Sequence, residues 1–455
     1  MEWARSHKPN LDNLRAALDW CSATNDLNLR DELTAAAIPL LSHLSLIEEC
    51  RMRIQTALTK RPDGNARDEK CEMQLFAGLG MALSYKRGGG QDTNSAWQRC
   101  LVNGERVGDI DYQLRAIRGL WTSSFNIGDM ENVQRLGRQF DDVAGPTMSS
   151  ENALMSRRMR GMQLFYHGRI TEARNDLQSV FDGYAKQKPG LDVLRFQFDQ
   201  TVIACVNLSK VLWLQGLPLQ ATEMVIKSLN TAKLVNHDLS LIYTLAFGAC
   251  RISINTGDFA AAEKYIEDLF QCELVDRAGP WKYFGQCWKG VLLSKQGRAD
   301  NAVEVLKDAL TGIRDGSFGM HHTRFLAELA FALACAGRVS EGLAAIRKAV
   351  EICERLEERW FLAEILRLEG EILALDRGTS IELSQKCFMR AISLAKHQGA
   401  LAFELRSATS LVRHDTTQGK AESMAMLQSV YSKFVEGFET VDLKEAKAVL
   451  DSGLC

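Results

Sequence analysis

Six turn glycines recur at a nearly constant interval and constrain the fold more than any other feature of this sequence. Each is followed, five residues later, by a small or β-branched residue. The pairs are Gly128/Val133, Gly168/Ala173, Gly216/Ala221, Gly257/Ala262, Gly297/Ala302 and Gly337/Gly342. The glycines are spaced 40, 48, 41, 40 and 40 residues apart. This period predicts stacked supersecondary units that share one continuous core, an architecture typical of binding proteins.

Each unit predicts two antiparallel helices joined by a tight turn, because apolar residues recur at intervals of three and four on both sides of the glycine. The glycine can adopt the positive φ that ends the first helix. The position seven residues before it is small in five of the six units: Trp121, Gly161, Ser209, Cys250, Gly290 and Ala330. Small residues on facing helices predict a close crossing. The one longer spacing predicts an extended loop around residues 185–192.

Composition and charge agree with an all-α fold and exclude several function classes. Few windows alternate β-branched residues, so we expect almost no sheet. The 55 basic and 57 acidic residues leave a net charge of −2, which gives no overall field for nucleic acid. The longest weakly charged stretch, LAELAFALACAG, is 12 residues, below the roughly 20 needed to cross a bilayer. Twelve scattered cysteines without a CxxC pair predict free, buried thiols in a cytoplasmic setting.

No sequence motif indicates an enzyme or a cofactor. Gly88–Gly90 resembles a phosphate loop, but the chain has no GxxxxGK[ST], so a turn is expected there. His321 and His322 are adjacent, point apart on a helix and have no acidic or cysteine partner at ligand spacing, so no metal site is expected. No Ser/His/Asp or Cys/His arrangement is supported.

The two ends of the chain differ from the regular units. The stretch NLDNLRAALDWC predicts an amphipathic helix capped at Asn10 or Asp12, with apolar side chains available for burial at Leu11, Leu14, Leu18 and Trp20. A helix pair is expected next, over 29–43 and 47–58, and Pro39 can kink its first helix. Near the other end, Gly370 occupies the small packing position, and the last helix, DLKEAKAVLDSGL, is polar on one side like a terminal cap. We therefore expect N-terminal joining helices over 1–65, a repeat superhelix over 66–415 and capping helices over 416–455.

The units resemble tetratricopeptide repeats of a longer, roughly 40-residue kind. The opening NLDNLRAALDW resembles the helix that follows the nucleotide-binding module of bacterial STAND/AAA-type signal-transduction ATPases, including winged-helix regulators and cyclase fusions. The stretch HQGALAFELRSATSLVR, followed by VYSKFVEGFETVDLKEAKAVLD, resembles their C-terminal end. The resemblance implies a right-handed superhelix that acts as the sensor and partner-binding arm of such a regulator, with the ATPase, DNA-binding or cyclase module placed upstream.

In a tetratricopeptide superhelix the first helix of each pair lines the concave face. Ten, six and three residues before each glycine share one helical stripe. Four successive units each place one basic residue there among large apolar ones, and the stripe residues expected to bind a partner are Arg118, Phe125, Arg158, Phe165, Lys210, Trp213, Phe247 and Arg251. A cationic groove with aromatic walls suits an acidic peptide or a small anionic ligand. In the alternative interpretation, the rings are core between repeats and the basic residues form a solvated face.

A second aromatic cluster lies in GPWKYFGQCWKG and includes Trp281, Phe284 and Trp288. These rings form either a ligand wall or the packing face of a helix that starts after Pro280, which is what apolar residues at helical spacing usually indicate.

The sequence leaves two hypotheses for the function. The first is a sensor and protein-interaction module coupled to an upstream ATPase, which the apolar N-terminal helix favours. The alternative is a stand-alone scaffold that presents its concave face to a peptide.

Overall fold

The computed structural model describes residues 8–59, 67–145, 148–187, 190, 193–272, 275, 280–315, 319–376, 381–415 and 419–452. All regular structure in these ranges is helical. The helices before Gly216 are η1 (Lys8–Asn10), α2 (Leu11–Ala23), α3 (Leu27–His43), α4 (Ile47–Ala57), α5 (Glu69–Arg87), α6 (Gln91–Val107), α7 (Ile110–Ile127), α8 (Met130–Ala144), α9 (Ser150–Tyr166), α10 (Ile170–Tyr184), α11 (Val193–Phe196) and α12 (Gln200–Leu214).

The helices after Gly216 continue the same pattern of antiparallel pairs. They are α13 (Pro218–Val235), α14 (Asp238–Thr244), η2 (Leu245–Ala249), α15 (Cys250–Thr256), α16 (Phe259–Gln271), α18 (Trp281–Lys295), α19 (Ala299–Asp315), α20 (Gly319–Cys335), α21 (Val339–Arg355), α22 (Leu362–Leu375), α23 (Ile381–Gln398), α24 (Leu401–His414), α25 (Lys420–Tyr431) and α26 (Val441–Ser452). The segment η2 is one π-helical turn that joins α14 to α15.

The predicted fold class is confirmed: the chain is an all-α superhelix of tetratricopeptide-like hairpins. The six glycines that define the repeat all have φ between +75° and +83°, the left-handed conformation that glycine adopts most readily. They join α7 to α8, α9 to α10, α12 to α13, α15 to α16, α18 to α19, and α20 to α21. The helices cross closely, as predicted, because a Cβ atom added to Gly161 or Gly290 would lie 3.0 or 2.6 Å from a leucine on the facing helix.

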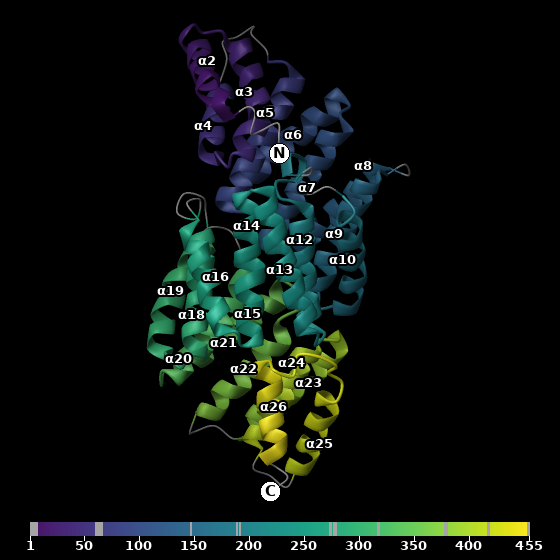
Figure 1. Cartoon of the computed structure of the whole chain (residues 1–455), viewed down its shortest axis with the longest axis vertical. Helices are drawn as coiled ribbons and strands as arrows, with labels where there is room; N and C mark the ends of the chain where they lie inside the picture. The colour runs from purple at the N-terminus through teal and green to yellow at the C-terminus, as the bar shows by residue number, and fades with distance from the viewer. Residues whose placement is uncertain are drawn as a thin grey trace.

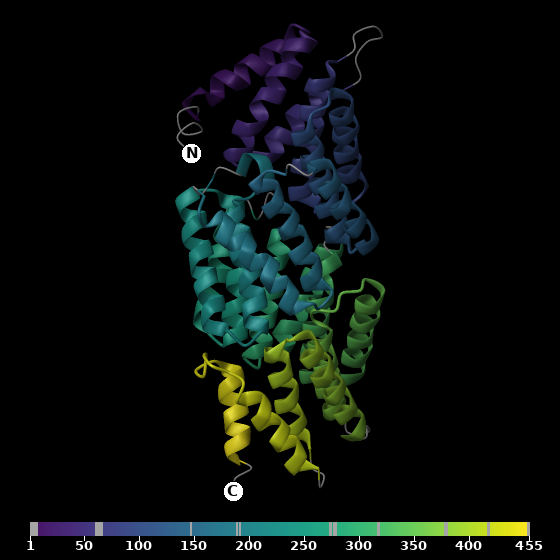
Figure 2. The ribbon, with the colours of Figure 1, turned by 90° about the vertical axis from the view of Figure 1, so that its right-hand side faces the viewer.

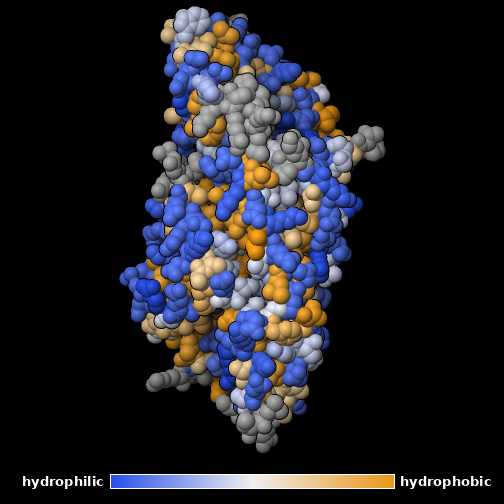
Figure 3. All heavy atoms as spheres, viewed as in Figure 1, coloured by the Kyte–Doolittle hydropathy of each residue, from blue (hydrophilic) through white to orange (hydrophobic). Residues whose placement is uncertain are grey.

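The molecule is elongated, with α2–α6 towards one end of its long axis and α22–α26 at the other (Figures 1 and 2). Hydrophilic side chains cover most of the face seen in Figure 3, and hydrophobic ones form smaller patches between them. No helix of the described part of the chain is both long and apolar enough to span a bilayer. The described cysteines are free thiols, most of them buried.

Successive turns of the superhelix touch each other, a feature that the repeat alone did not predict. A Cβ atom added to Gly257 would lie 2.8 Å from the Cβ of Val441, which belongs to the last helix. The backbone N–H groups of Arg359 and Trp360 donate to the carbonyl oxygen of Tyr166, at 2.7 and 3.2 Å. Glu436 accepts hydrogen bonds from two backbone N–H groups at the start of α13. The predicted concave face is therefore a narrow interior.

The N-terminal region agrees with the sequence in its helices and differs in one side chain. The expected pair over 29–43 and 47–58 is present as α3 and α4, and Pro39 lies inside α3. Leu18 is buried, but Trp20, which was expected to be available for burial, is 58% exposed. Asn10 occupies the N-cap position of α2 without a capping hydrogen bond from its side chain. The predicted loop at residues 185–192 lies partly outside the described residues, and the three-part division of the chain remains a prediction.

The contact between superhelical turns can be tested with two matched substitutions. Gly257→Ala and Gly297→Ala both place a Cβ atom at positive φ, which costs about 1–2 kcal/mol. Of the two, only the Cβ added at Gly257 would clash, with Val441, because nothing lies within 4 Å of a Cβ added to Gly297. We expect Gly257→Ala to lower the free energy of unfolding by a further ~1–3 kcal/mol in chemical denaturation. Equal losses in the two variants would show that Val441 does not pack on this turn.

Candidate ligand-binding cavity

A cavity of ≈ 100 Å³ lies in the interior of the superhelix. Its walls come from α5, α7, α9, α12, α14, η2, α18 and α20, and from the residues that follow α11. Helices far apart in the sequence therefore meet here because the superhelix coils around them. Among the side chains that line the cavity are five of the predicted stripe residues, Arg118, Phe125, Arg158, Lys210 and Phe247.

The other three predicted residues are buried next to the cavity and do not line it. Phe165 stacks on Trp360, with ring centroids 5.2 Å apart. Trp213 packs edge-on against Phe403, 5.5 Å between centroids. The guanidinium of Arg251 lies 4.4 Å from the centroid of the Trp360 ring. The two aromatic residues thus contribute to the contact between turns.

Several lining residues were not predicted, because they lie outside the three stripe positions. They are Tyr85, Tyr166, Gln197, Phe198, Tyr243 and His321, among others. Trp281 also lines the cavity and, like Phe284 and Trp288 of the same helix, is buried. The packing-face interpretation is therefore confirmed, and a ligand wall at Trp281 stays a prediction. Arg324, buried beside Trp288, lies thirteen residues before Gly337 and continues the stripe by one turn.

The π-helical turn η2 helps to orient two of these side chains. One extra residue in a helical turn rotates everything after it by about 100° around the helix axis. Phe247 lies within the turn and Arg251 just beyond it, and both point to the interior. The indole Nε1 of Trp288 donates to the carbonyl oxygen of Ala246 in this turn, at 2.6 Å. The sequence carried no signal for the π turn.

Five cations are buried in this interior. Their exposed fractions lie between 3 and 7%, and they are Arg118, Arg158, Lys210, Arg251 and Arg324. None of them forms an ion pair with any residue that the structure describes. The interpretation in which these basic residues form a solvated face is therefore wrong. Burying a cation without a partner is costly, so this arrangement calls for a compensating group.

A second buried charge cluster in the same superhelix shows the opposite arrangement. Arg367 and Arg406 both donate to Glu364, at 2.9 and 3.2 Å, and Arg406 also donates to Asp442 at 2.8 Å. Burial alone would raise the pKa of Glu364, but the two arginines lower it to about 2. The fold thus pairs buried arginines with carboxylates near its C-terminal end and leaves them unpaired around the cavity.

Several buried hydrogen-bond donors near the cavity have no acceptor among the described residues. The Nε–H groups of Arg118 and Arg158 and the indole N–H groups of Trp121 and Trp281 are buried without an acceptor among the described residues. Buried donors are normally satisfied by protein, water or a ligand. A molecule rich in acceptor oxygens would satisfy them.

The cations also shift one another's pKa values. Burial, together with nearby Arg158, lowers the pKa of Arg118 to about 9. Burial lowers the pKa of Lys210 well below its usual value, with Arg251 and Arg324 adding repulsion. Guanidinium groups keep their proton at neutral pH, so the positive charge persists in the interior. A bound anion would relieve both effects.

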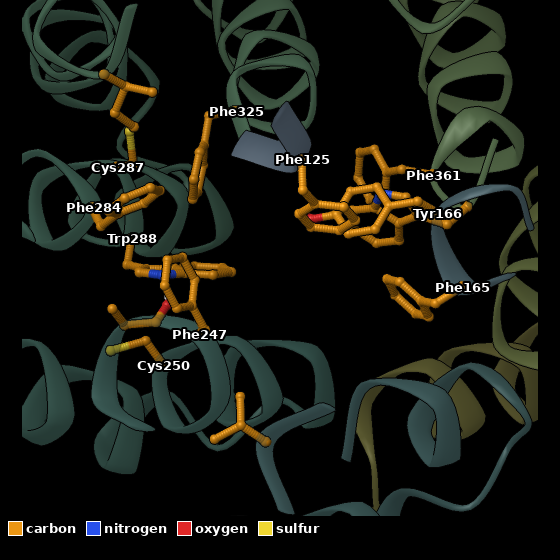
Figure 4. Packing of buried hydrophobic residues seen from close by; sticks show 14 of the residues in the cluster. Phe125, Phe165, Tyr166, Phe247, Cys250, Phe284, Cys287, Trp288, Phe325 and Phe361 are labelled. Carbon is orange, nitrogen blue, oxygen red and sulfur yellow. The ribbon is translucent and has the colours of Figure 1, made fainter. Parts of the chain in front are cut away.

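Buried aromatic rings are numerous in this interior (Figure 4). Phe247, Phe284, Trp288 and Phe325 gather on one side of the view, and Phe125, Phe165, Tyr166 and Phe361 on the other. The rings of Phe125 and Tyr166 meet edge-on with centroids 4.5 Å apart. Such rings supply rigid contact area and a low-dielectric surrounding, in which charge interactions are strong.

A larger groove of ≈ 430 Å³ adjoins the cavity at Arg118 and Gln197, which line both. It runs between α3, α5 and α7 and is also lined by Arg115 and Arg195. Arg195 is paired there with Asp111 and Glu151. Within the described ranges, no group of His, Cys, Asp and Glu residues is arranged to hold a metal ion.

Comparison with known proteins finds structural similarity at low sequence identity. No protein-family model matches this sequence, and no curated protein matches it. The chain is similar to a Rap protein complexed with Competence and Sporulation Factor, at 9% identity and a TM-score of 0.48, over 93% of this chain and 98% of that one. It is similar to the apo quorum sensor NprR from B. thuringiensis, at 13% identity and a TM-score of 0.47, over 80% of this chain and 97% of that one. It is also similar to a human IFIT1 dimer with m7Gppp-AAAA, at 13% identity and a TM-score of 0.46, over 93% of this chain and 89% of that one.

The carboxyl group of Glu358 provides a test of the buried charge balance. It is fully buried beside Arg251, and one of its oxygens accepts from the indole of Trp360 at 2.8 Å. Burial raises its pKa to about 7, against the opposing effects of Trp360 and Arg251. Between pH 4.5 and 7 the folded protein therefore holds a proton that the unfolded chain releases, so this group's contribution to stability falls as the pH rises.

We expect Glu358→Gln, which mimics the protonated form, to remove this dependence. Relative to wild type, the variant should gain about 2–3 kcal/mol in the free energy of unfolding between pH 5 and pH 8. Urea denaturation of both proteins at several pH values measures this difference and cancels the titration of the other groups. A difference that stays constant with pH would show that Glu358 is not held in a proton-binding environment.

Proposed function

We propose that this chain is a sensor and protein-interaction module that binds a small anionic ligand in its central cavity. Three buried cations that line the cavity, Arg118, Arg158 and Lys210, have no carboxylate partner among the described residues, and they carry this proposal. The cavity volume of ≈ 100 Å³ suits a small anion better than an extended peptide. The alternative function, a scaffold that presents a concave face to a peptide, has less support because the interior is narrow.

Ligand binding in the cavity would affect the packing between superhelical turns. Tyr166 lines the cavity, and its carbonyl oxygen accepts the hydrogen bonds of Arg359 and Trp360 from the next turn. Trp360 also lies under Arg251. An anion that neutralises the cations would strengthen this contact and so alter the coiling of the superhelix. A change in coiling would alter the surface that a bound partner protein contacts, and so its affinity.

The partner in this proposal is a protein module docked near the N-terminal helices. The resemblance to signal-transduction regulators implies an upstream ATPase in this role. Trp20 of α2 and Leu29 of α3 are exposed apolar side chains in that region, which supports a joint there. Neither nucleic acid nor a membrane is part of the proposal.

Anion binding can be tested by thermal unfolding at constant ionic strength, with malonate and inorganic phosphate as probes. We expect a saturable rise in Tm, corresponding to about 2.7 kcal/mol when the anion is at a hundred times its Kd. Arg118→Gln and Arg158→Gln should each weaken the effect at least tenfold in concentration. Arg135→Gln, which changes an exposed arginine on α8, should leave it unchanged.

Two results would contradict the proposal. One is a rise in Tm that does not saturate, as expected for nonspecific salt effects. The other is an equal response in Arg158→Gln and Arg135→Gln, because a cavity site depends on the first residue and a surface site does not. Circular dichroism of each variant establishes that it retains its helices.

A further inference from the structure

Lys210 has a property that the arginines around the cavity lack, since it carries a primary amine. It lies in α12, a helix whose every residue is buried, and it is the one lysine among the described residues that line the cavity. Its protonated Nζ can donate three hydrogen bonds. Among the described residues it donates one, to Asn207 Oδ1 at 3.2 Å. The face of Phe247 lies 5.6 Å from Nζ.

The groups around Lys210 favour the neutral amine. Arg158 lines the same cavity from α9, Arg251 lies on α15 and Arg324 on α20. His321 of α20 also lines the cavity. Burial, Lys210, Arg251 and Arg324 lower its pKa, so it stays a neutral imidazole and offers Lys210 no compensating charge. Arginines retain their protons, so Lys210 is the group that loses its proton when positive charges are crowded together. A desolvated lysine next to cations is a nucleophile towards carbonyl groups.

We propose that Lys210 forms an imine with a small anionic carbonyl compound, such as an α-keto acid or an aldehyde acid, whose carboxylate is held by Arg118 and Arg158. Nζ adds to the carbonyl carbon, and both hydrogens of the amine leave with the carbonyl oxygen as one molecule of water. A carbon–nitrogen double bond replaces the carbon–oxygen double bond, and no oxidant or reductant takes part. The inference rests on the proposed function, because it assigns a chemical class to the anion.

The cavity suits such a compound in size and surroundings. Its volume of ≈ 100 Å³ accommodates a molecule as small as glyoxylate or pyruvate. The indole N–H groups of Trp121 and Trp281, which have no acceptor among the described residues, can donate to oxygens of the ligand that the arginines leave free. The aromatic walls limit access of water, which would otherwise hydrolyse the imine. Arg118 and Arg158 line the same cavity, so a carboxylate bound there can interact with both.

Reductive trapping tests this chemistry on the full chain. The protein is incubated with glyoxylate or pyruvate and cyanoborohydride at pH 7, digested and mapped by mass spectrometry. We expect the reduced adduct on Lys210 to form at least tenfold faster than on Lys227, an exposed lysine of the neighbouring helix α13. An exposed lysine with a pKa near 10.4 is neutral in only about one molecule in a few thousand at pH 7.

Variants and a competitor separate the outcomes. Lys210→Arg keeps the charge and should abolish the adduct, while Lys227→Arg should leave labelling of Lys210 unchanged. Malonate, which has no reactive carbonyl, should protect Lys210. If malonate stabilises the protein but Lys210 is labelled no faster than Lys227, the imine is disproved and anion binding stands. If neither occurs, both proposals fail. Equal labelling by neutral acetaldehyde, unaffected by Arg158→Gln, would overturn the role of the arginines.

Discussion

Unpaired positive charge in a low-dielectric interior is the constraint around which the centre of this superhelix is arranged. Moving a cation out of water costs several kcal/mol even after the protein relaxes. Part of that cost is offset by aromatic faces, since Arg251 lies over Trp360 and Arg324 lies 4.5 Å from the centroid of Trp288. Glu358 beside Arg251 and Glu328 near Arg324 offset a further part, whereas Arg118, Arg158 and Lys210 have no carboxylate partner among the described residues. An anionic ligand is the simplest group that would balance their charge.

The tight coiling of the superhelix creates this interior. Some turn glycines let a hairpin close without a side chain at the point where the next superhelical turn packs, as at Gly257 and Val441. The same coiling brings Trp360 beside Phe165 and under Arg251. Charge balance in the cavity and contact between turns therefore share residues, and the proposed sensor function depends on this sharing.

The sequence predicts most of the fold because the repeat is local. Gly168 and Ala173 lie in one hairpin, and their roles follow from helical spacing alone. The stripe positions predict Arg118, Arg158 and Lys210 correctly as interior residues, because helix periodicity fixes the side on which they lie.

The rest of the site depends on contacts between turns, which the repeat does not encode. Phe165 and Trp213 pack against Trp360 and Phe403, almost two hundred residues further along the chain, instead of lining the cavity. Arg324 was not predicted because it lies one helical turn before the three stripe positions of its unit. Trp20 is exposed although its helix is amphipathic, since no described neighbour covers that side.

The most direct measurement is anomalous diffraction from crystals grown with selenate, a small dianion that the cavity can hold. The account predicts a selenium peak in the cavity, with its oxygens within hydrogen-bonding distance of Arg118 and Arg158. Selenate peaks confined to the outer surface, with ordered water satisfying the buried donors, would contradict it.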